Sequence, residues 1–275
     1  MKNYINIEKL IQEQEIFSIQ RISSNDTSKY AIICISGFLS EGEDEKEMWK
    51  AVVESFPDAQ VFALKYSSTK LKEFVGSCFL DLYSIISKFL PISFYLPLLN
   101  LSESNAIKQF ELASKNAVVT GKLLAICIAL GMPLPYESIS LFAFSLGTKV
   151  ITTCVHYLNK LHVYHKIHDI ILMGGATAVS KKIAKYSSYF QVANGKVFNC
   201  YSKKDWVLYA LSVIKNITLI GSGSLECYSK SLTEKALIDT GKAIENICLT
   251  EFVPGHLKYR DKLFNILEII FSKYI

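Results

Sequence analysis

Ser145 stands at the junction of two segments with different periodicity. The residues before it, SISLFAF at 138–144, are apolar and β-rich, and those after it carry apolar residues at helical spacing. A serine between a strand and a helix occupies the sharp turn that exposes a nucleophilic hydroxyl in acyl-transfer enzymes. That turn needs small residues two positions to either side, here Ala143, where glycine is usual, and Gly147. The alternative is that Ser145 only caps the following helix.

A serine nucleophile needs a base, because its hydroxyl is barely ionised at neutral pH. His256 lies in the segment FVPGHLKYRDKL, in a Pro-Gly loop between the last predicted strand and the final helix. The other four histidines, at 156, 162, 165 and 168, precede a strand or lie within a helix. His256 is therefore the predicted base, and the alternative is a water-exposed residue at a helix start.

The base in turn needs a carboxylate to hold its tautomer. Asp205, in CYSKKDWVLYAL, follows a predicted strand and completes the chain order Ser, Asp, His that is expected of α/β-hydrolases. Asp169 lies at the start of its predicted strand, which is the wrong end, Asp239 lies before the last strand, and Glu251 lies within that strand. The alternative role for Asp205 is to cap the helix WVLYALSVI, and we expect one side chain to perform only one of these tasks well.

Acyl transfer also needs N–H donors for the developing oxyanion. The Leu146 amide follows the nucleophile directly. A second donor is expected in the loop after the strand AIICIS, where Gly37 allows close backbone approach. We predict the Phe38 amide, with the Leu39 amide as the substitute. The alternative is that SGF forms an ordinary turn at the end of the strand.

With these residues identified, the chain resembles a known family, the α/β-hydrolase domain of the transmembrane-and-coiled-coil-domain-containing protein 4 family. The resemblance rests on ISGFLSE, FSLGTKVI, NCYSKKDWVL and PGHLKYRDKL and spans residues 31 to about 265. The family tends to read GFSLGARVI at the second motif. The resemblance implies an α/β-hydrolase fold with its site on Ser145, Asp205 and His256. The family's coiled-coil and membrane portions are not evident in this chain, and the resemblance supplies no substrate.

The elements around these motifs alternate between apolar strands and helices. Predicted strands cover residues 16–22, 29–38, 59–66, 138–144, 169–176, 196–202 and 246–252. This alternation predicts a mostly parallel sheet with helices on both faces, and functional groups at the carboxyl ends of its strands. We expect a single α/β-hydrolase domain over 1–275, with an apolar helical cap inserted at about 70–110.

The segment FLPISFYLPLLNLS at 89–102 carries no charge, and its apolar zone extends back over 74–101. It is shorter than the roughly 20 apolar residues of a spanning helix and contains two prolines. Three interpretations stay open: a lid, a segment that makes peripheral membrane contact, or ordinary core. The segment GKLLAICIALGMPLPY, which leads into the Ser145 strand, is interpreted as a buried crossover helix.

Net charge and cysteine spacing limit the classes of partner and the cellular compartment that we expect. The net charge is +5, and no Lys/Arg cluster is interleaved with aromatic residues, so nucleic acid is not an expected partner. The seven cysteines contain no CxxC pair, which favours a reducing compartment over a disulfide framework or a metal site. The N-terminal residues lack an apolar signal-peptide core, so the expected location is cytoplasmic or at a membrane periphery; non-classical export stays open.

These observations predict a serine ester hydrolase that needs no metal or organic cofactor. The apolar zone at 74–101 and the positive net charge favour a lipid ester, either a glycerolipid or a phospholipid. Small-ester or thioester hydrolysis is the first alternative. The second is a non-catalytic, membrane-associated adaptor that keeps a hydrolase fold.

Overall fold

The computed structural model describes residues 17–38, 40, 43–68, 105–132, 134–179, 190–225 and 244–272. The apolar segment at 74–101 lies outside these residues, as do Leu39 and Asp239. Seven strands form one sheet in the order β1-β3-β2-β4-β5-β6-β7. Their bounds are β1 Phe17–Arg21, β2 Tyr30–Ile35, β3 Gln60–Tyr66, β4 Ser138–Phe144, β5 Ile167–Met173, β6 Val197–Tyr201 and β7 Ile244–Cys248.

The sheet is mostly parallel, as the alternation of strands and helices predicts. Only β1 runs antiparallel, where it pairs with β3 at one edge. Each of the other pairings, from β3 through to β7, is parallel. The ends of the central strands are in register, because Ala143 of β4 pairs with Ile35 of β2 and Leu172 of β5. The loops that follow these strands therefore meet at one edge of the sheet.

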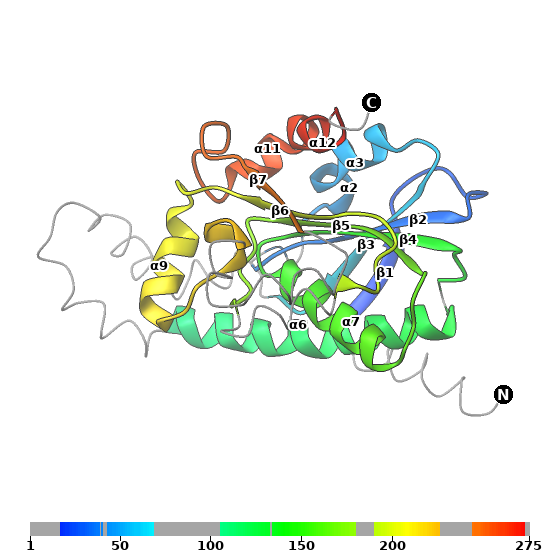
Figure 1. Ribbon diagram of the computed structural model, residues 1–275, viewed down its shortest axis with the longest axis horizontal. Helices are drawn as coiled ribbons and strands as arrows, with labels where there is room; N and C mark the ends of the chain where they lie inside the picture. The colour runs from blue at the N-terminus through cyan, green and yellow to red at the C-terminus, as the bar shows by residue number, and fades with distance from the viewer. Residues whose placement is uncertain are drawn as a thin grey trace, which may run out of the picture.

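Helices cover both faces of the sheet (Figure 1). Helices α6 and α7 lie on one face, and α2, α3, α11 and α12 lie on the other, while α9 stands at the end of the sheet. The bounds are α2 Glu45–Met48, α3 Lys50–Ser55, α6 Asn105–Leu130, α7 Gly147–Lys160, α9 Trp206–Lys215, α11 Lys258–Asp261 and α12 Leu263–Phe271, with a 3₁₀ turn η2 at Ile220–Ser222. Trp49 separates α2 from α3, and Lys262 separates α11 from α12.

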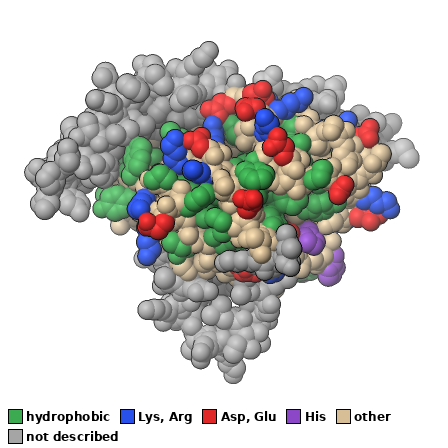
Figure 2. All heavy atoms as spheres, turned by 90° about the horizontal axis from the view of Figure 1, so that it is seen from above, with side chains coloured by type: hydrophobic (Ala, Val, Ile, Leu, Met, Phe, Trp, Pro, Cys, Tyr) green, Lys and Arg blue, Asp and Glu red, His purple; other side chains and the backbone are tan. Residues whose placement is uncertain are grey.

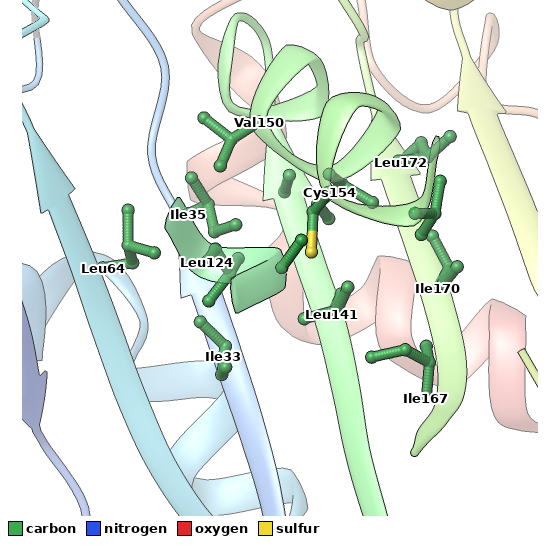
Figure 3. Packing of buried hydrophobic residues seen from close by; sticks show 14 of the residues in the cluster. Ile33, Ile35, Leu64, Leu124, Leu141, Val150, Cys154, Ile167, Ile170 and Leu172 are labelled. Atoms are coloured by element: carbon green, nitrogen blue, oxygen red, sulfur yellow. The ribbon is translucent and has the colours of Figure 1, made fainter. Parts of the chain in front are cut away.

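The core consists of two apolar layers, one on each face of the sheet. In β2, Ile33 and Ile35 face the layer under α6 and α7, whereas Ile32 and Cys34 face the opposite layer. Figure 3 shows the first layer, where strand side chains meet Leu124 of α6 and Val150 of α7. Because the strands are buried on both faces, they read in the sequence as continuous apolar runs.

Helix α6 is the crossover between β3 and β4. It has 26 residues and is about 39 Å long. Residues Ile107–Leu130 are long and apolar enough to cross a membrane by length and composition alone. Here the helix packs on α7 so closely that a Cβ on Gly121 would lie 2.5 Å from the Val150 carbonyl oxygen. The predicted buried crossover is therefore confirmed, and α6 includes residues 105–110 of the segment predicted as cap.

The described surface carries charges of both signs. The face in Figure 2 shows Lys and Arg side chains interspersed with Asp and Glu. Of the described cysteines, Cys34, Cys127, Cys154 and Cys200 are buried, and Cys248 is exposed. Within the described ranges, no three His, Cys, Asp or Glu side chains gather in a way that could hold a metal ion.

Candidate active site

Ser145 occupies a strained turn between β4 and α7. Its φ angle is +54°, in the left-handed region that residues other than glycine rarely adopt. Two backbone bonds hold this conformation: the Ser145 N–H donates to the Met173 carbonyl at 2.9 Å, and the Ser145 carbonyl accepts from the Ala176 N–H at 3.0 Å. Strain that persists because neighbouring backbone fixes it is typical of functional turns.

The small residues on either side of Ser145 are required by close backbone packing. A Cβ on Gly147 would lie 2.4 Å from the Ile35 carbonyl oxygen, so only glycine fits there. Ala143 is fully buried in β4 between β2 and β5. Its methyl group is accommodated in the core, which explains why alanine can stand where the pattern usually has glycine.

Three side chains predicted from the sequence lie in one hydrogen-bonded chain. Ser145 Oγ is 2.8 Å from His256 Nε2, and His256 Nδ1 is 2.7 Å from Asp205 Oδ2. Because a carboxylate only accepts hydrogen bonds, Nδ1 carries the imidazole proton and Nε2 is left to accept from the serine hydroxyl. All three residues are buried, with 5%, 7% and 3% of Ser145, His256 and Asp205 exposed. This is the geometry of a base-activated nucleophile.

Asp205 serves two partners at once. While Oδ2 accepts from His256, Oδ1 accepts from the Leu208 N–H at 3.1 Å and caps α9. The expectation that capping and contact with the base exclude each other is wrong. A carboxylate has two oxygens that can accept in different directions, so the helix cap fixes the orientation in which Oδ2 meets the imidazole.

The loops after β6 and β7 are joined by side chains that the sequence analysis did not single out. Ser202 Oγ donates to the Val253 carbonyl at 2.7 Å and accepts from the Lys204 N–H at 3.2 Å. Thr250 Oγ1 accepts from the Lys203 N–H at 3.0 Å. These bonds hold the loop that carries Asp205 against the loop that carries His256. The only signal in the sequence is a hydroxyl residue just after each strand.

The other acids and histidines considered lie elsewhere. Asp169, near the start of β5, accepts from the Lys196 N–H at 2.7 Å, at the opposite end of the sheet from Ser145. Glu251 is exposed and pairs with Lys204 at 3.3 Å. Among the described histidines, only His256 is hydrogen-bonded to Ser145.

The predicted oxyanion residues flank Ser145. Leu146 is buried at the start of α7. On the other side, a Cβ on Gly37 would lie 2.6 Å from Ser145 Cβ, so the loop after β2 passes directly against Ser145. Ser40 Oγ donates to the Gly37 carbonyl at 2.7 Å and supports this loop. The Phe38 ring packs edge-on against Phe110 of α6, with ring centres 5.5 Å apart.

The motif His-Leu-x-Tyr-Arg-Asp links His256 to the rest of the candidate site. The His256 ring lies on Phe144, the residue before Ser145, with ring centres 4.8 Å apart. Tyr259 also packs against the Phe144 ring, and its burial raises the pKa of its phenol. Arg260 lies over Phe144 and forms an ion pair with Glu43, in the stretch between β2 and α2. The short helix α11 therefore contacts both the residue before Ser145 and the stretch between β2 and α2.

A buried acid lies behind the loop that contains Gly37. Glu45 of α2 accepts from the Ser36 hydroxyl at 2.9 Å, and the Trp49 indole N–H donates to the same hydroxyl oxygen at 3.1 Å. Burial raises the pKa of the Glu45 carboxyl, and the Ser36 hydrogen bond offsets part of this effect. The sequence analysis did not identify this group, since a glutamate in the first turn of a helix is ordinarily exposed.

The sheet order, the helices on both faces and the turn at Ser145 define the α/β-hydrolase fold. A poly(3-hydroxybutyrate) depolymerase, LpqC, from Bordetella parapertussis has a similar structure, with a TM-score of 0.50 and 10% identity over 94% of this chain and 84% of that one. At this identity the likeness shows the fold alone. The fold predicted from the sequence is thus confirmed.

A family model described as a protein of unknown function, DUF726, matches residues 3–273, and the chain belongs to this family. A Saccharomyces cerevisiae relative named "Probable lipase MIL1" is 28% identical over 82% of this chain and 19% of its own length. A rice relative named "Transmembrane and coiled-coil domain-containing protein STS1" is 29% identical over 54% of this chain and 20% of its own. The resemblance drawn from the four motifs is confirmed.

The curated relatives are much longer than the matched region. Two matches to an uncharacterized membrane protein of Schizosaccharomyces pombe cover 17% and 41% of that protein's own length. The comparisons therefore concern only a portion of each of those proteins.

Proposed function

We propose that this protein is a serine ester hydrolase that works through an acyl-enzyme. The observation that carries the proposal is the buried Ser145–His256–Asp205 chain of hydrogen bonds, with its nucleophile in a strained turn at the carboxyl end of β4. A serine that merely capped α7 would need neither the imidazole at 2.8 Å nor the positive φ angle.

The reaction has two steps. Ser145 Oγ attacks the ester carbonyl carbon while His256 Nε2 takes its proton, and the tetrahedral intermediate collapses as the imidazolium returns the proton to the leaving alcohol. Water then attacks the acyl-enzyme with the same base, which releases the acid and restores the serine hydroxyl. Asp205 holds the tautomer and stabilises the imidazolium. Proton transfer by a positioned base contributes about 10²–10⁴-fold to such a rate.

Backbone amides would stabilise the negative charge on the intermediate. The candidates are the N–H groups of Leu146 and Phe38, which belong to the two segments that flank Ser145. The close approach of Gly37 to Ser145 supports this assignment, because the Phe38 amide follows Gly37 directly in the chain. Loss of one such donor typically costs about 10²–10³ in kcat.

The substrate class we favour is a lipid ester, a glycerolipid or a phospholipid. The relative from Saccharomyces cerevisiae carries the name of a lipase and matches 82% of this chain. The apolar zone at 74–101 lies between β3 and α6 in sequence, where insertions often shape an acyl pocket. Each methylene moved from water into such a pocket contributes about 0.8 kcal/mol.

A fluorophosphonate probe tests the nucleophile. The wild-type protein should be labelled, and Ser145→Ala and His256→Ala should each abolish labelling, while Thr152→Ala on α7 serves as a matched control. Labelling that survives Ser145→Ala would assign the chemistry to another residue. A folded wild-type protein that is neither labelled nor able to hydrolyse p-nitrophenyl esters of any chain length would favour the non-catalytic adaptor.

A further inference from the structure

Helix α9 follows directly after its cap, Asp205, and presents apolar side chains to the surface. Its sequence, WVLYALSVIK, carries no charge before Lys215, and only Leu208 and Ala210 in it are buried. Trp206 and Val213 are each 36% exposed, and Ile217, just beyond the helix, is 37% exposed. Trp206 and Val213 are seven residues apart, which places them in one stripe along the helix, whereas Ile217 follows the left-handed Asn216 that ends α9. Tyr209, 55% exposed, lies in the same stripe.

A further apolar residue, which lies outside α9 and beside the candidate site, extends this exposed apolar surface. Leu257, which follows His256 directly, is 71% exposed. The loop that carries it touches α9, because a Cβ on Gly255 would lie 3.8 Å from the Trp206 indole nitrogen. We call the combination of Trp206, Tyr209, Val213, Ile217 and Leu257 the apolar rim. It borders the site from both the Asp205 side and the His256 side, and α9 stands at this end of the sheet in Figure 1.

Cationic side chains border the apolar rim. Lys203 and Lys204 precede α9, and Lys258 follows Leu257; all three are exposed. Lys204 pairs with Glu251 and Lys258 with Asp261, so among these exposed groups the excess charge is positive, through Lys203, on a chain whose net charge is +5. Exposed tryptophan and leucine edged by lysine is the composition that suits the boundary between lipid headgroups and acyl chains, especially where the headgroups are anionic.

We infer that the apolar rim is a docking surface for an anionic lipid bilayer. A bilayer would cover the exposed faces of Trp206, Val213 and Leu257 with acyl chains while its headgroups meet Lys203. The rim adjoins both Asp205 and His256, so docking would bring ester bonds of the lipid to the end of the sheet where Ser145 lies. The role of this docking rests on the proposed function. Binding to lipid can nevertheless be measured without any reaction.

The two tryptophans of the chain provide a direct readout. Trp49 is 2% exposed in the core, whereas Trp206 lies in the rim. Vesicles of phosphatidylcholine with one part in three of phosphatidylglycerol should therefore shift the emission of Trp206, and brominated phosphatidylcholine should quench it. In co-sedimentation, Leu257→Ser and Val213→Ser should each weaken vesicle binding by about tenfold. Lys203→Glu should weaken binding to anionic vesicles only.

Controls separate docking from catalysis and from folding. Phe264→Ser, which removes an aromatic side chain that is 48% exposed on α12, should leave vesicle binding unchanged. Ser145→Ala should also bind vesicles fully, so loss of activity and loss of docking are distinguished. Folded wild-type protein that does not bind anionic vesicles would overturn the inference. Binding that survives in the double variant Leu257→Ser, Val213→Ser would also overturn it. A dimer in sedimentation velocity that this double variant dissociates would overturn it as well, because the rim would then be the contact with a second copy of the chain.

Discussion

At the scale of single residues, the candidate site depends on residues that affect both the local backbone and the candidate chemistry. Asp205 caps α9 with one oxygen and meets His256 with the other. Gly37 leaves space on one side of Ser145, and Gly147 leaves space for the backbone of β2 on the other. In each case one substitution changes both the local backbone and the candidate chemistry, so paired substitutions are needed to separate them.

Asp205 offers such a pair. Asp205→Asn keeps an oxygen that can accept from the Leu208 N–H but removes the charge that holds the imidazole tautomer, so we expect kcat to fall on the order of 10⁴-fold with little loss of stability. Asp205→Ala should lose the same activity and in addition about 1 kcal/mol of stability, because the helix cap is gone. Ester turnover and urea unfolding measure the two effects. Equal stability of both variants would contradict the capping role.

Gly37 tests the oxyanion side. Gly37→Ala would place a methyl group 2.6 Å from Ser145 Cβ, so the loop or the nucleophile must move. We expect kcat to fall about 10²–10³-fold, as for loss of an oxyanion donor. Gly255→Ala is the matched control, since the nearest atom to its added methyl lies at 3.8 Å. Full activity in Gly37→Ala would place the oxyanion donors elsewhere.

At the scale of elements, the site is built from loops that adjacent parallel strands bring together. Ser145 follows β4, Asp205 follows β6, and His256 follows β7, while the loop with Gly37 follows β2. The helices then fix these loops: α9 through Asp205, and α11 through the ion pair of Arg260 with Glu43. Helix α7 follows Ser145, and the long helix α6 packs against α7.

The contact between α6 and α7 is sensitive to side-chain size at one position. Gly121→Val should destabilise the protein by about 1–3 kcal/mol, because its Cβ would meet the Val150 carbonyl oxygen at 2.5 Å and Thr153 Cβ at 2.7 Å. Val119→Ala, two residues away at a position that is 40% exposed, should change stability by about 0.5 kcal/mol or less. Chemical denaturation measures both. Equal effects would mean that α6 does not pack closely on α7.

At the scale of the whole molecule, one buried acid links stability to pH. Burial raises the pKa of Glu45 above its ordinary value of 4.5, so the native state binds this proton more tightly than the unfolded chain. Its contribution to stability is present below pH 4.5 and is lost as the pH rises through the raised pKa.

Glu45→Gln should therefore be more stable than wild type at neutral pH. It keeps a carbonyl that can accept from the Ser36 hydroxyl and has no charge to bury. The difference in unfolding free energy between the variant and wild type should grow as the pH rises from the acid range, in denaturant titrations at several pH values. Glu47→Gln, an exposed change in the same helix, should show no such trend.

Much of the architecture follows from local sequence. The buried strands are short apolar runs, and α7 has helical apolar spacing, so their types and order can be predicted without long-range information. The turn at Ser145 is also local, because small residues at 143 and 147 are needed wherever a strand meets a helix so sharply. The order Ser145, Asp205, His256 then follows from which residues stand just after strands.

Other features depend on contacts between residues far apart in the chain, which local patterns do not encode. The approach of Gly37 to Ser145 and the bond from Ser202 to Val253 arise only when strands pair in register. The two uses of Asp205 need α9 and the His256 loop to approach one carboxylate from different directions. The raised pKa of Glu45 likewise requires the layer that buries it. Periodicity and strain determine elements and turns, whereas only packing decides distances, burial and shared hydrogen bonds.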